Sequence, residues 1–275
     1  MSKKTLYLSD LDGTLLTPEA KLTDHSAGII NRLIDQGMLF TFATARSYVS
    51  AIKVTEKLRL QLPAAVYNGA FLVNFQTGIP MEKCILDKEK LTKLLQGVQA
   101  AGFVPLVYAI VEGEERVSWL EGREREKPGI RAYLESRQGD KRLRPVDDYA
   151  ELFAGELFYL TFIGTKGEME EIEPLCRNDH LYSHLQADTY NREEYWLETY
   201  RWDASKARAL ERLKEIAGAD EVVCFGDNLN DLPMFQLADR CYAVEGAHPA
   251  LIAAATGVIG SNREEGVARW LAENA

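Results

Sequence analysis

The chain has 275 residues, 46% of them hydrophobic and 27% charged, which predicts a globular protein of one large domain or two ordinary ones. Its formal net charge of −10 argues against nucleic acid or an anionic membrane as the main partner, because both require a basic surface. The apolar runs are too short to span a bilayer, no signal peptide precedes Asp10, and the four cysteines form no Cys-x-x-Cys pair, so we expect a cytoplasmic protein.

The first third of the chain alternates strands and helices. We predict strands at 6–9, 38–44 and 63–67 and helices at 25–36 and 48–60. The helices are indicated by apolar residues at helical spacing, and the turn pair Asn68-Gly69 ends the third strand. Strands and helices in this order imply a parallel sheet with right-handed crossovers.

The pattern changes after about Met81. A helix leads into PLVYAIVEGEERVSWLE, which predicts a hairpin with Glu112-Gly113 at its turn. An arginine-rich section follows, and then a strand from Glu156, a short helix and another strand. This middle third is typical of a separate α+β unit with antiparallel pairing.

Near Tyr190 the α/β alternation returns. YWLETY predicts a strand, residues 205–217 a helix, and EVVCF a further strand, while Pro233 falls in the first turn of the next helix. The sequence therefore predicts a parallel-sheet domain that is interrupted by an inserted domain.

Polar residues follow each predicted strand of this parallel sheet. They are Asp10 and Asp12, Thr44, Asn68 and Gly69, and then Gly226, Asp227, Asn228, Asn230 and Asp231 in the string GDNLND. Open α/β sheets bind ligands beyond the carboxyl ends of their strands, so we expect these side chains to share one edge.

Four aspartates at one edge require a cation. A single aspartate after a strand is most simply a turn former or a helix cap, but adjacent carboxylates repel by about 1–3 kcal/mol. Oxygen ligands without histidine or cysteine suit magnesium. Magnesium beside a carboxylate nucleophile indicates phosphoryl chemistry. The Thr44 hydroxyl and Lys206, at a helix start, are candidates to bind the remaining phosphate oxygens.

With DLDGTLL, FATAR, SKARAL and GDNLND in order, the chain resembles the haloacid dehalogenase-like phosphatases, in particular their Cof-type, sugar-phosphatase-like branch. The resemblance implies an α/β fold, with a Rossmann-like parallel sheet core at 1–82 and 189–275 and an inserted α+β cap domain at 83–188. It also implies a magnesium-dependent phosphatase that hydrolyses a small phosphorylated metabolite, expected to be a sugar phosphate, through an aspartyl-phosphate intermediate.

Site roles follow from the resemblance by motif. Asp10 is expected to be the nucleophile and Asp12 the general acid and base. These two roles require Asp10 to be ionised and bound to the metal, and the Asp12 carboxyl group to carry a proton away from the metal. The implied metal ligands are Asp10, the Asp12 carbonyl, Asp227 and Asp231, the last directly or through water. The implied phosphate- or substrate-binding residues are Thr44, Ala45, Arg46, Asn68, Gly69, Lys206 and Asn230.

Two motifs depart from the family pattern. The family's Thr/Ser-Gly-Arg is Thr44-Ala45-Arg46 here, and alanine narrows the backbone freedom at the position expected to donate an amide. Near the C-terminus the family's Gly-Asn-Ala is replaced by Gly246-Ala247 without an asparagine.

Some signals are discounted. His180 and His184 are four apart on a predicted strand, which argues against a metal pair. Arg46 either reaches a substrate or forms an ion pair. The remaining groups are expected to pack or to face solvent: the aromatic residues Tyr195, Trp196, Tyr200 and Trp202, and the basic residues Arg123, Arg125, Lys127 and Arg131.

Two other functions remain open from the sequence. A phosphotransferase or sugar phosphomutase would use every one of these motifs and differ only in the acceptor. A phospho-accepting signalling module also gathers aspartates, a threonine and a lysine, but its acidic pair is contiguous, whereas Asp10 and Asp12 are separated by one residue.

Overall fold

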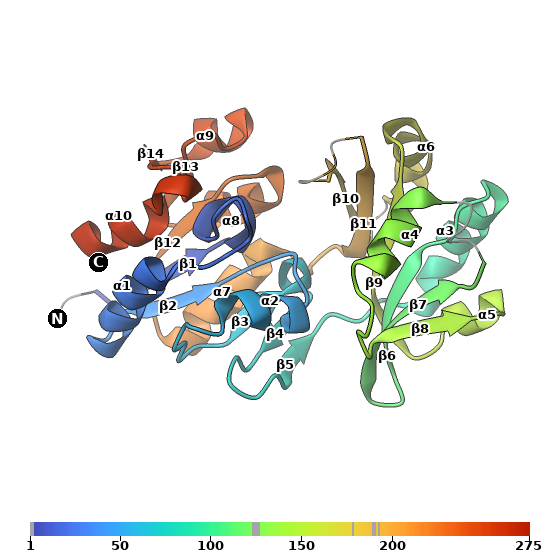
Figure 1. The fold of residues 1–275 in the computed structure, drawn as a ribbon, viewed down its shortest axis with the longest axis horizontal. Coiled ribbons are helices and arrows are strands. Elements are labelled where there is room, and N and C mark those ends of the chain that lie inside the picture. Colours follow the sequence, from blue (N-terminus) through green and yellow to red (C-terminus); the bar gives the residue numbers. More distant parts are fainter. Residues whose placement is uncertain (1–2, 123–126, 178, 189–190, 192) are drawn as a thin grey trace. The chain divides into compact units, whose positions relative to one another are not determined.

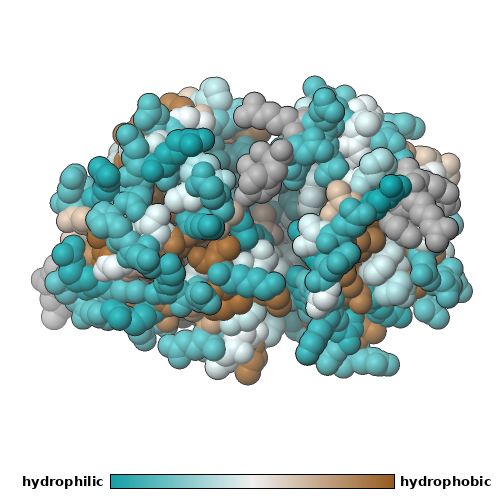
Figure 2. All heavy atoms as spheres, in the orientation of Figure 1, coloured by the Kyte–Doolittle hydropathy of each residue, from teal (hydrophilic) through white to brown (hydrophobic). Residues whose placement is uncertain are grey.

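The chain forms two compact units, which we call the core and the cap. The structure is a computed structural model that describes residues 3–122, 127–177, 179–188, 191 and 193–275. The core comprises Met1–Lys83 and Ala204–Ala275, and the cap comprises Cys84–Asp203 (Figure 1). Hydrophilic side chains cover most of the face shown in Figure 2, in keeping with the high share of charged residues.

The core is built on a five-stranded, wholly parallel sheet in the order β14-β13-β12-β1-β2. Its strands are β1 (Thr5–Ser9), β2 (Leu39–Phe42), β12 (Glu221–Gly226), β13 (Arg240–Val244) and β14 (Gly257–Ile259). In β1 and β12 all residues after the first are buried, as expected of central parallel strands with both faces covered. The predicted parallel sheet is confirmed.

Helices connect these strands. They are α1 (Asp24–Asp35), α2 (Tyr48–Thr55), α7 (Lys206–Ala217), α8 (Leu232–Leu237), α9 (Pro249–Ala254) and α10 (Gly266–Asn274). α1 packs against α10, and α7 packs against α8 (Figure 1). α1 begins where the Thr23 hydroxyl accepts from Ser26 N (3.0 Å), and it buries Ile30 and Leu33 at helical spacing.

α2 ends at Thr55, whereas the sequence predicts a helix to residue 60. The residues that follow bond to α1 instead of continuing the helix. Asn31 of α1 donates to Lys57 O (2.8 Å), and its side-chain oxygen accepts from Arg59 N (2.8 Å).

The predicted third parallel strand lies in a different sheet. β3 (Ala64–Val66), β4 (Phe71–Val73) and β5 (Pro80–Lys83) form an antiparallel three-stranded sheet. The turn at Tyr67–Gly69 reverses the chain, so that β3 pairs with β4. One parallel bridge, between Ala43 and Ala65, still places β3 beside the residue that follows β2.

The cap is an α+β unit on a six-stranded sheet in the order β10-β11-β9-β6-β7-β8. All its strand pairs are antiparallel except β7 with β8. The strands are β6 (Leu106–Val111), β7 (Glu114–Leu120), β8 (Leu143–Val146), β9 (Glu156–Gly164), β10 (Leu181–Ala187) and β11 (Tyr195–Arg201). The helices are α3 (Lys88–Ala100), α4 (Pro128–Glu135), α5 (Tyr149–Leu152) and α6 (Lys166–Cys176).

The chain returns to the core at Ala204 rather than at residue 189. β11 is the reason, because it pairs with both β9 and β10 inside the cap sheet. α3 and α6 bury a hydrophobic cluster with this sheet that includes Leu94, Ile172 and Leu197. Among the described residues, no helix is both long and apolar enough to cross a membrane.

Candidate active site

Neighbouring strands of the core bring acidic side chains to one edge of the sheet. Asp10 follows β1 directly and Asp227 follows β12 directly, and Asp10 N continues the ladder by donating to Phe225 O (3.0 Å). Asp231 lies in the short 3₁₀ turn Leu229–Asp231. One carboxylate oxygen from each of Asp10, Asp227 and Asp231 lies within 4.8 Å of the others. The acidic strand ends that the sequence places together therefore meet.

Lys206 lies between two of these carboxylates. Its Nζ is 2.8 Å from Asp10 Oδ1 and 2.7 Å from Asp231 Oδ1, and its side chain is fully buried. Lys206 begins α7 after Ser205, whose hydroxyl caps the helix. Gly69 permits this approach, because a Cβ at Gly69 would lie 2.4 Å from Ser205 O. The start of α7, packed against Gly69, thus holds the Lys206 ammonium group beside Asp10 and Asp231.

Both oxygens of Asp231 are engaged within the protein. Oδ1 pairs with Lys206, while Oδ2 accepts from the backbone nitrogens of Asp227 (3.0 Å) and Asn228 (3.1 Å). A Cβ at Gly226 would lie 2.7 Å from Asp231 Oδ2, so glycine is needed where the loop folds over this carboxylate. Asp231 fixes the loop that carries Asp227.

Gly13 and Thr14 support Asp227, although neither was predicted from the sequence as a site residue. Thr14 Oγ1 donates to Asp227 Oδ1 (3.0 Å). Gly13 has a φ of +77°, and a Cβ there would lie 2.2 Å from Asp227 Oδ2. The signal was present in the string DLDGT, whose glycine and threonine follow the two aspartates.

Thr44 is buried just after β2, the strand that pairs with β1. Its Oγ1 accepts from Arg46 N (3.1 Å), and its carbonyl accepts from Asn68 N (2.8 Å). Ala45 is half-buried and does not have a positive φ. Alanine therefore fits this turn, although the family pattern has glycine at this position.

Arg46 forms an ion pair with Asp12. Its Nε lies 2.6 Å from Asp12 Oδ2 and its Nη2 lies 2.6 Å from Asp12 Oδ1, a bidentate arrangement. The third guanidinium nitrogen, Nη1, donates to Ser50 Oγ (3.1 Å) in the first turn of α2. Of the two roles that the sequence left open for Arg46, the structure shows the ion pair.

Asn68 and Asn230, which follow β3 and β12, are joined by a hydrogen bond. Asn230 Nδ2 donates to Asn68 Oδ1 (3.2 Å), and Asn68 is almost fully buried. Tyr67, Asn68 and Gly69 all have positive φ, which is uncommon for a tyrosine and an asparagine in succession. Backbone bonds from Tyr67 N to Arg46 O and from Asn68 N to Thr44 O stabilise this conformation beside the predicted phosphate site.

The electrostatics of the site favour a further cation. Burial, followed by the charge of Asp231, raises the pKa of Asp10 well above its usual value, against the opposing effect of Lys206. The same two causes raise the pKa of Asp227 to about 7. Burial alone would lower the pKa of Lys206, but Asp10 and Asp231 outweigh it and the pKa is raised. One ammonium group among three carboxylates leaves negative charge uncompensated.

The donor set fits a hard divalent cation. Asp10, Asp227 and Asp231 offer carboxylate oxygens, and the cluster contains no histidine or cysteine. Magnesium binds through one or two carboxylates and keeps several waters, so this small oxygen-only cluster suits it. The residues at the site thus fit the metal that the sequence predicts.

The histidines and aromatic residues of the cap that were not expected to bind a ligand mostly contact other residues of the cap. His184 lies on β10 opposite Glu198, and its Nε2 is 3.2 Å from Gln186 Oε1. His180 precedes β10, and its carbonyl accepts from Trp202 N (3.1 Å). Of the aromatic group, Trp196 packs on Tyr133, Tyr200 stacks on Tyr159 and Tyr195 packs against the cap cluster, whereas Trp202 is exposed.

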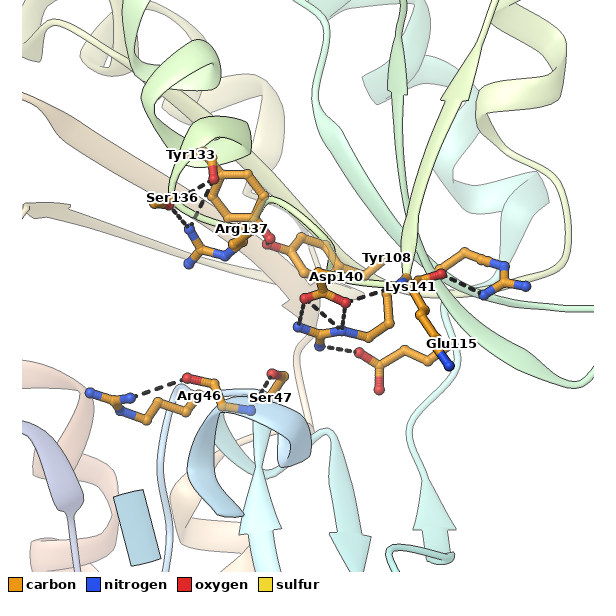
Figure 3. A network of polar contacts seen from close by, with 12 residues as sticks. Arg46, Ser47, Tyr108, Glu115, Tyr133, Ser136, Arg137, Asp140 and Lys141 are labelled. Atoms are coloured by element: carbon orange, nitrogen blue, oxygen red, sulfur yellow. Dashed lines mark hydrogen bonds and ion pairs between the residues drawn. The ribbon is translucent and has the colours of Figure 1, made fainter. Parts of the chain in front are cut away.

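The basic section of the cap is partly ion-paired. Lys127 Nζ lies 2.6 Å from Glu168 Oε1, and Arg131 is exposed, while Arg123 and Arg125 lie outside the described residues. Arg142 Nη1 lies 2.6 Å from Glu115 Oε1, and Arg142 Nη2 lies 2.6 Å from Asp140 Oδ2. Figure 3 shows Asp140 and Glu115 pointing toward the same guanidinium. Lys127 and Arg142 thus form ion pairs within the cap itself.

Comparison with known proteins identifies the family. A family model described as haloacid dehalogenase-like hydrolase matches residues 7–271. Pyridoxal phosphate phosphatase YbhA of Escherichia coli is 25% identical over 272 residues, and 5-amino-6-(5-phospho-D-ribitylamino)uracil phosphatase YwtE of Bacillus subtilis is 23% identical over 280 residues. Each match covers 95% of this chain and 95% of the relative.

Solved structures agree in fold. A haloacid dehalogenase-like hydrolase from Bacteroides thetaiotaomicron superposes with a TM-score of 0.79 at 22% identity, over 98% of this chain and 99% of that chain. The two full-length relatives are phosphatases, as the sequence motifs predict. The chain therefore belongs to the haloacid dehalogenase-like hydrolase family and is an enzyme of that family.

Proposed function

We propose that the protein is a magnesium-dependent phosphatase that hydrolyses a small phosphorylated metabolite through a phosphorylated Asp10. The observation that supports this most is the position of Asp10. Its buried carboxylate is 2.8 Å from Lys206 Nζ and shares a 4.8 Å cluster with Asp227 and Asp231. A carboxylate held between a cation and an oxygen-only metal site is suited to attack a phosphoryl group.

Asp10 is the proposed nucleophile. Its Oδ1 accepts from Leu11 N (2.7 Å) and pairs with Lys206, which fixes the carboxylate at the strand end. In the first step a carboxylate oxygen attacks phosphorus, the bond from phosphorus to the leaving oxygen breaks, and Asp12 supplies a proton to that oxygen. In the second step water attacks phosphorus, its proton passes to Asp12, and the bond to Asp10 breaks to release phosphate.

Magnesium would be held by Asp10, the Asp12 carbonyl and Asp227, with Asp231 binding directly or through water. When bound, it offsets the repulsion between the Asp10 carboxylate and the phosphate and orients one phosphoryl oxygen. The two hydrogen bonds to Asp231 Oδ2 and the ion pair at its Oδ1 favour the water-mediated arrangement for Asp231.

Thr44, Lys206 and Asn230 are proposed to surround the phosphate. The Thr44 Oγ1 accepts from Arg46 N, which leaves its own proton to donate to a phosphoryl oxygen. Lys206 neutralises phosphate charge, and the Ala45 amide supplies a further donor. Gly69 contributes by letting Lys206 approach, and the Asn68–Asn230 pair holds this side of the site.

The substrate is proposed to be a small phosphate monoester. The sequence motifs indicate a sugar phosphate, while the relatives named above carry the names of pyridoxal phosphate and of a phosphoribitylamino-uracil. The four cysteines are buried and form no disulfide in the part of the chain that the structure describes, which is consistent with a reducing compartment, and we propose the cytoplasm.

A panel of phosphorylated metabolites, assayed with and without magnesium, tests the proposal. It should contain sugar phosphates, pyridoxal phosphate and a sugar bisphosphate, with phosphate release and sugar isomers measured in parallel. We expect phosphate release that requires magnesium and is lost in Asp10→Asn with the circular dichroism spectrum retained. Full turnover by Asp10→Asn would refute the proposal, and isomer formation without phosphate release would indicate a phosphomutase.

A further inference from the structure

The contact between Arg46 and Asp12 joins the loops that follow two neighbouring strands. Asp12 lies in the turn after β1, and Arg46 lies between β2 and α2. Both oxygens of Asp12 are engaged by one guanidinium at 2.6 Å. The Asp12 side chain is 37% exposed, so without this contact it would be free to take several rotamers.

Arg46 is itself held from several directions. Its backbone nitrogen donates to Thr44 Oγ1 and its carbonyl accepts from Tyr67 N (2.9 Å). Its Nη1 donates to Ser50 Oγ (3.1 Å), and only 19% of its side chain is exposed. The guanidinium is therefore held in one position. Because it binds a carboxylate through two parallel hydrogen bonds, it also determines the plane of that carboxylate.

We propose that Arg46 is a positioning residue that orients Asp12 for the hydrolysis of the phosphorylated Asp10. The inference rests on the proposed function. In that step the ionised Asp12 takes a proton from the attacking water, phosphorus gains the water oxygen, and the bond between phosphorus and Asp10 breaks. The bidentate contact holds the accepting carboxylate in one orientation toward the site of attack.

A direct substrate contact by Arg46 is the competing role. Nε and Nη2 are both used by Asp12, and Nη1 is used by Ser50. A contact with phosphate would have to share a guanidinium whose plane is already set by its bidentate contact with Asp12. The geometry therefore favours action through Asp12, and the two roles predict different kinetics.

Rapid-mixing kinetics with p-nitrophenyl phosphate and magnesium separate the roles. p-Nitrophenolate is a good leaving group, so the first step needs little help from Asp12, whereas the second step needs Asp12 as a base. For Arg46→Ala we expect a burst of about one equivalent of p-nitrophenolate, followed by a steady-state rate about 10–100-fold below that of the wild type with KM little changed. Arg46→Lys, with a single nitrogen for two oxygens, and Ser50→Ala should show the same pattern more weakly. Added guanidinium should restore part of the rate in Arg46→Ala.

Arg59→Ala is the matched control, because Arg59 pairs with Asp35 on the exposed surface of the same unit and should leave turnover unchanged. A raised KM without a burst would assign Arg46 to substrate binding, and wild-type kinetics in Arg46→Ala would show that the ion pair has no role; either result overturns the inference. An inactive wild type or an active Asp10→Asn would instead overturn the proposed function, and this inference with it.

Discussion

Replacing Lys206 with methionine removes the cation that lies between Asp10 and Asp231. Methionine has a similar length and fills the space, so the main change is the loss of charge. The lysine and Asp231 side chains are fully buried and that of Asp10 is 7% exposed. Removing one partner of a buried ion pair costs about 3–5 kcal/mol, because the remaining charge is left unpaired. We expect Lys206→Met to lower the free energy of unfolding of the magnesium-free protein by that amount at pH 8.

The loss should depend on pH in a defined direction. The charge of Lys206 lowers the pKa of Asp10 and of Asp227, so without it both pKa values rise further above their unfolded values. A carboxyl group whose pKa is raised in the folded protein binds more protons there than in the unfolded chain. Stability is then retained at low pH and lost as pH rises, by about 1–2 kcal/mol per pH unit for each proton bound.

Urea unfolding in the presence of a chelator, at pH 5, 6, 7 and 8, measures this effect. The difference between wild type and Lys206→Met should be small at pH 5 and largest at pH 8. Lys206→Met combined with Asp231→Asn should recover part of the lost stability, because one of the uncompensated carboxylates is removed. Identical midpoints for wild type and Lys206→Met across this pH range would show that the lysine does not stabilise the acidic cluster.

Three further predictions concern the metal site and the cap. The dissociation constant for magnesium, measured by calorimetry, should rise by up to about tenfold for each pH unit below pH 7. The reason is that the pKa of Asp227 is about 7, and its carboxylate must lose its proton to bind the metal. A constant dissociation constant from pH 6 to 8 would contradict this prediction. Gly13→Ala should lower magnesium affinity at least about tenfold, since its Cβ would lie 2.2 Å from Asp227 Oδ2, whereas Gly28→Ala, which meets nothing within 4 Å, should not. Arg142→Ala should lower the free energy of unfolding in urea by about 1–3 kcal/mol, because it removes the ion pairs to Asp140 and Glu115, and it should leave magnesium affinity unchanged. A loss of magnesium affinity would count against a purely structural role for these ion pairs.

The acidic edge could be predicted from the sequence because each part of it is local. An apolar run followed by aspartates marks a buried strand and its carboxyl end, and this pattern occurs before both Asp10 and Asp227. Strands joined by helices form parallel sheets, and parallel strands end on the same edge. Two residues more than two hundred positions apart could therefore be placed together without a structure.

Strand pairing in the middle of the chain could not be predicted in the same way. β11 has the apolar character of a core strand, and only its hydrogen bonds to β9 and β10 assign it to the cap. β3 was expected in the parallel sheet, but the positive φ values of Tyr67 and Asn68 turn the chain back toward β4. Pairing partners depend on contacts between distant segments, which composition and periodicity do not report.

The partner of Arg46 was equally invisible in the sequence, because a basic residue beside a phosphate site fits either of two roles. Arg46 pairs with Asp12 because its side chain extends from the loop after β2 to the loop after β1. Ser50, which belongs to none of the sequence motifs, contacts the same guanidinium from the first turn of α2. Residues that act by holding others are recognised only once the geometry is known.

The ion-free core carries an unfavourable charge arrangement at the same residues that are proposed to perform the chemistry. The raised pKa values of Asp10 and Asp227 mean that folding opposes the ionised form of both groups. A divalent cation reverses this effect, because it favours the ionised carboxylates that the fold alone disfavours. Magnesium should therefore stabilise the folded protein more at pH 8 than at pH 6, and Asp227→Asn should remove most of this difference while making the magnesium-free protein more stable at pH 8. These outcomes would support the proposal that the acidic cluster binds a metal, because the raised pKa values of Asp10 and Asp227 mean that one lysine does not fully offset the charge of the cluster.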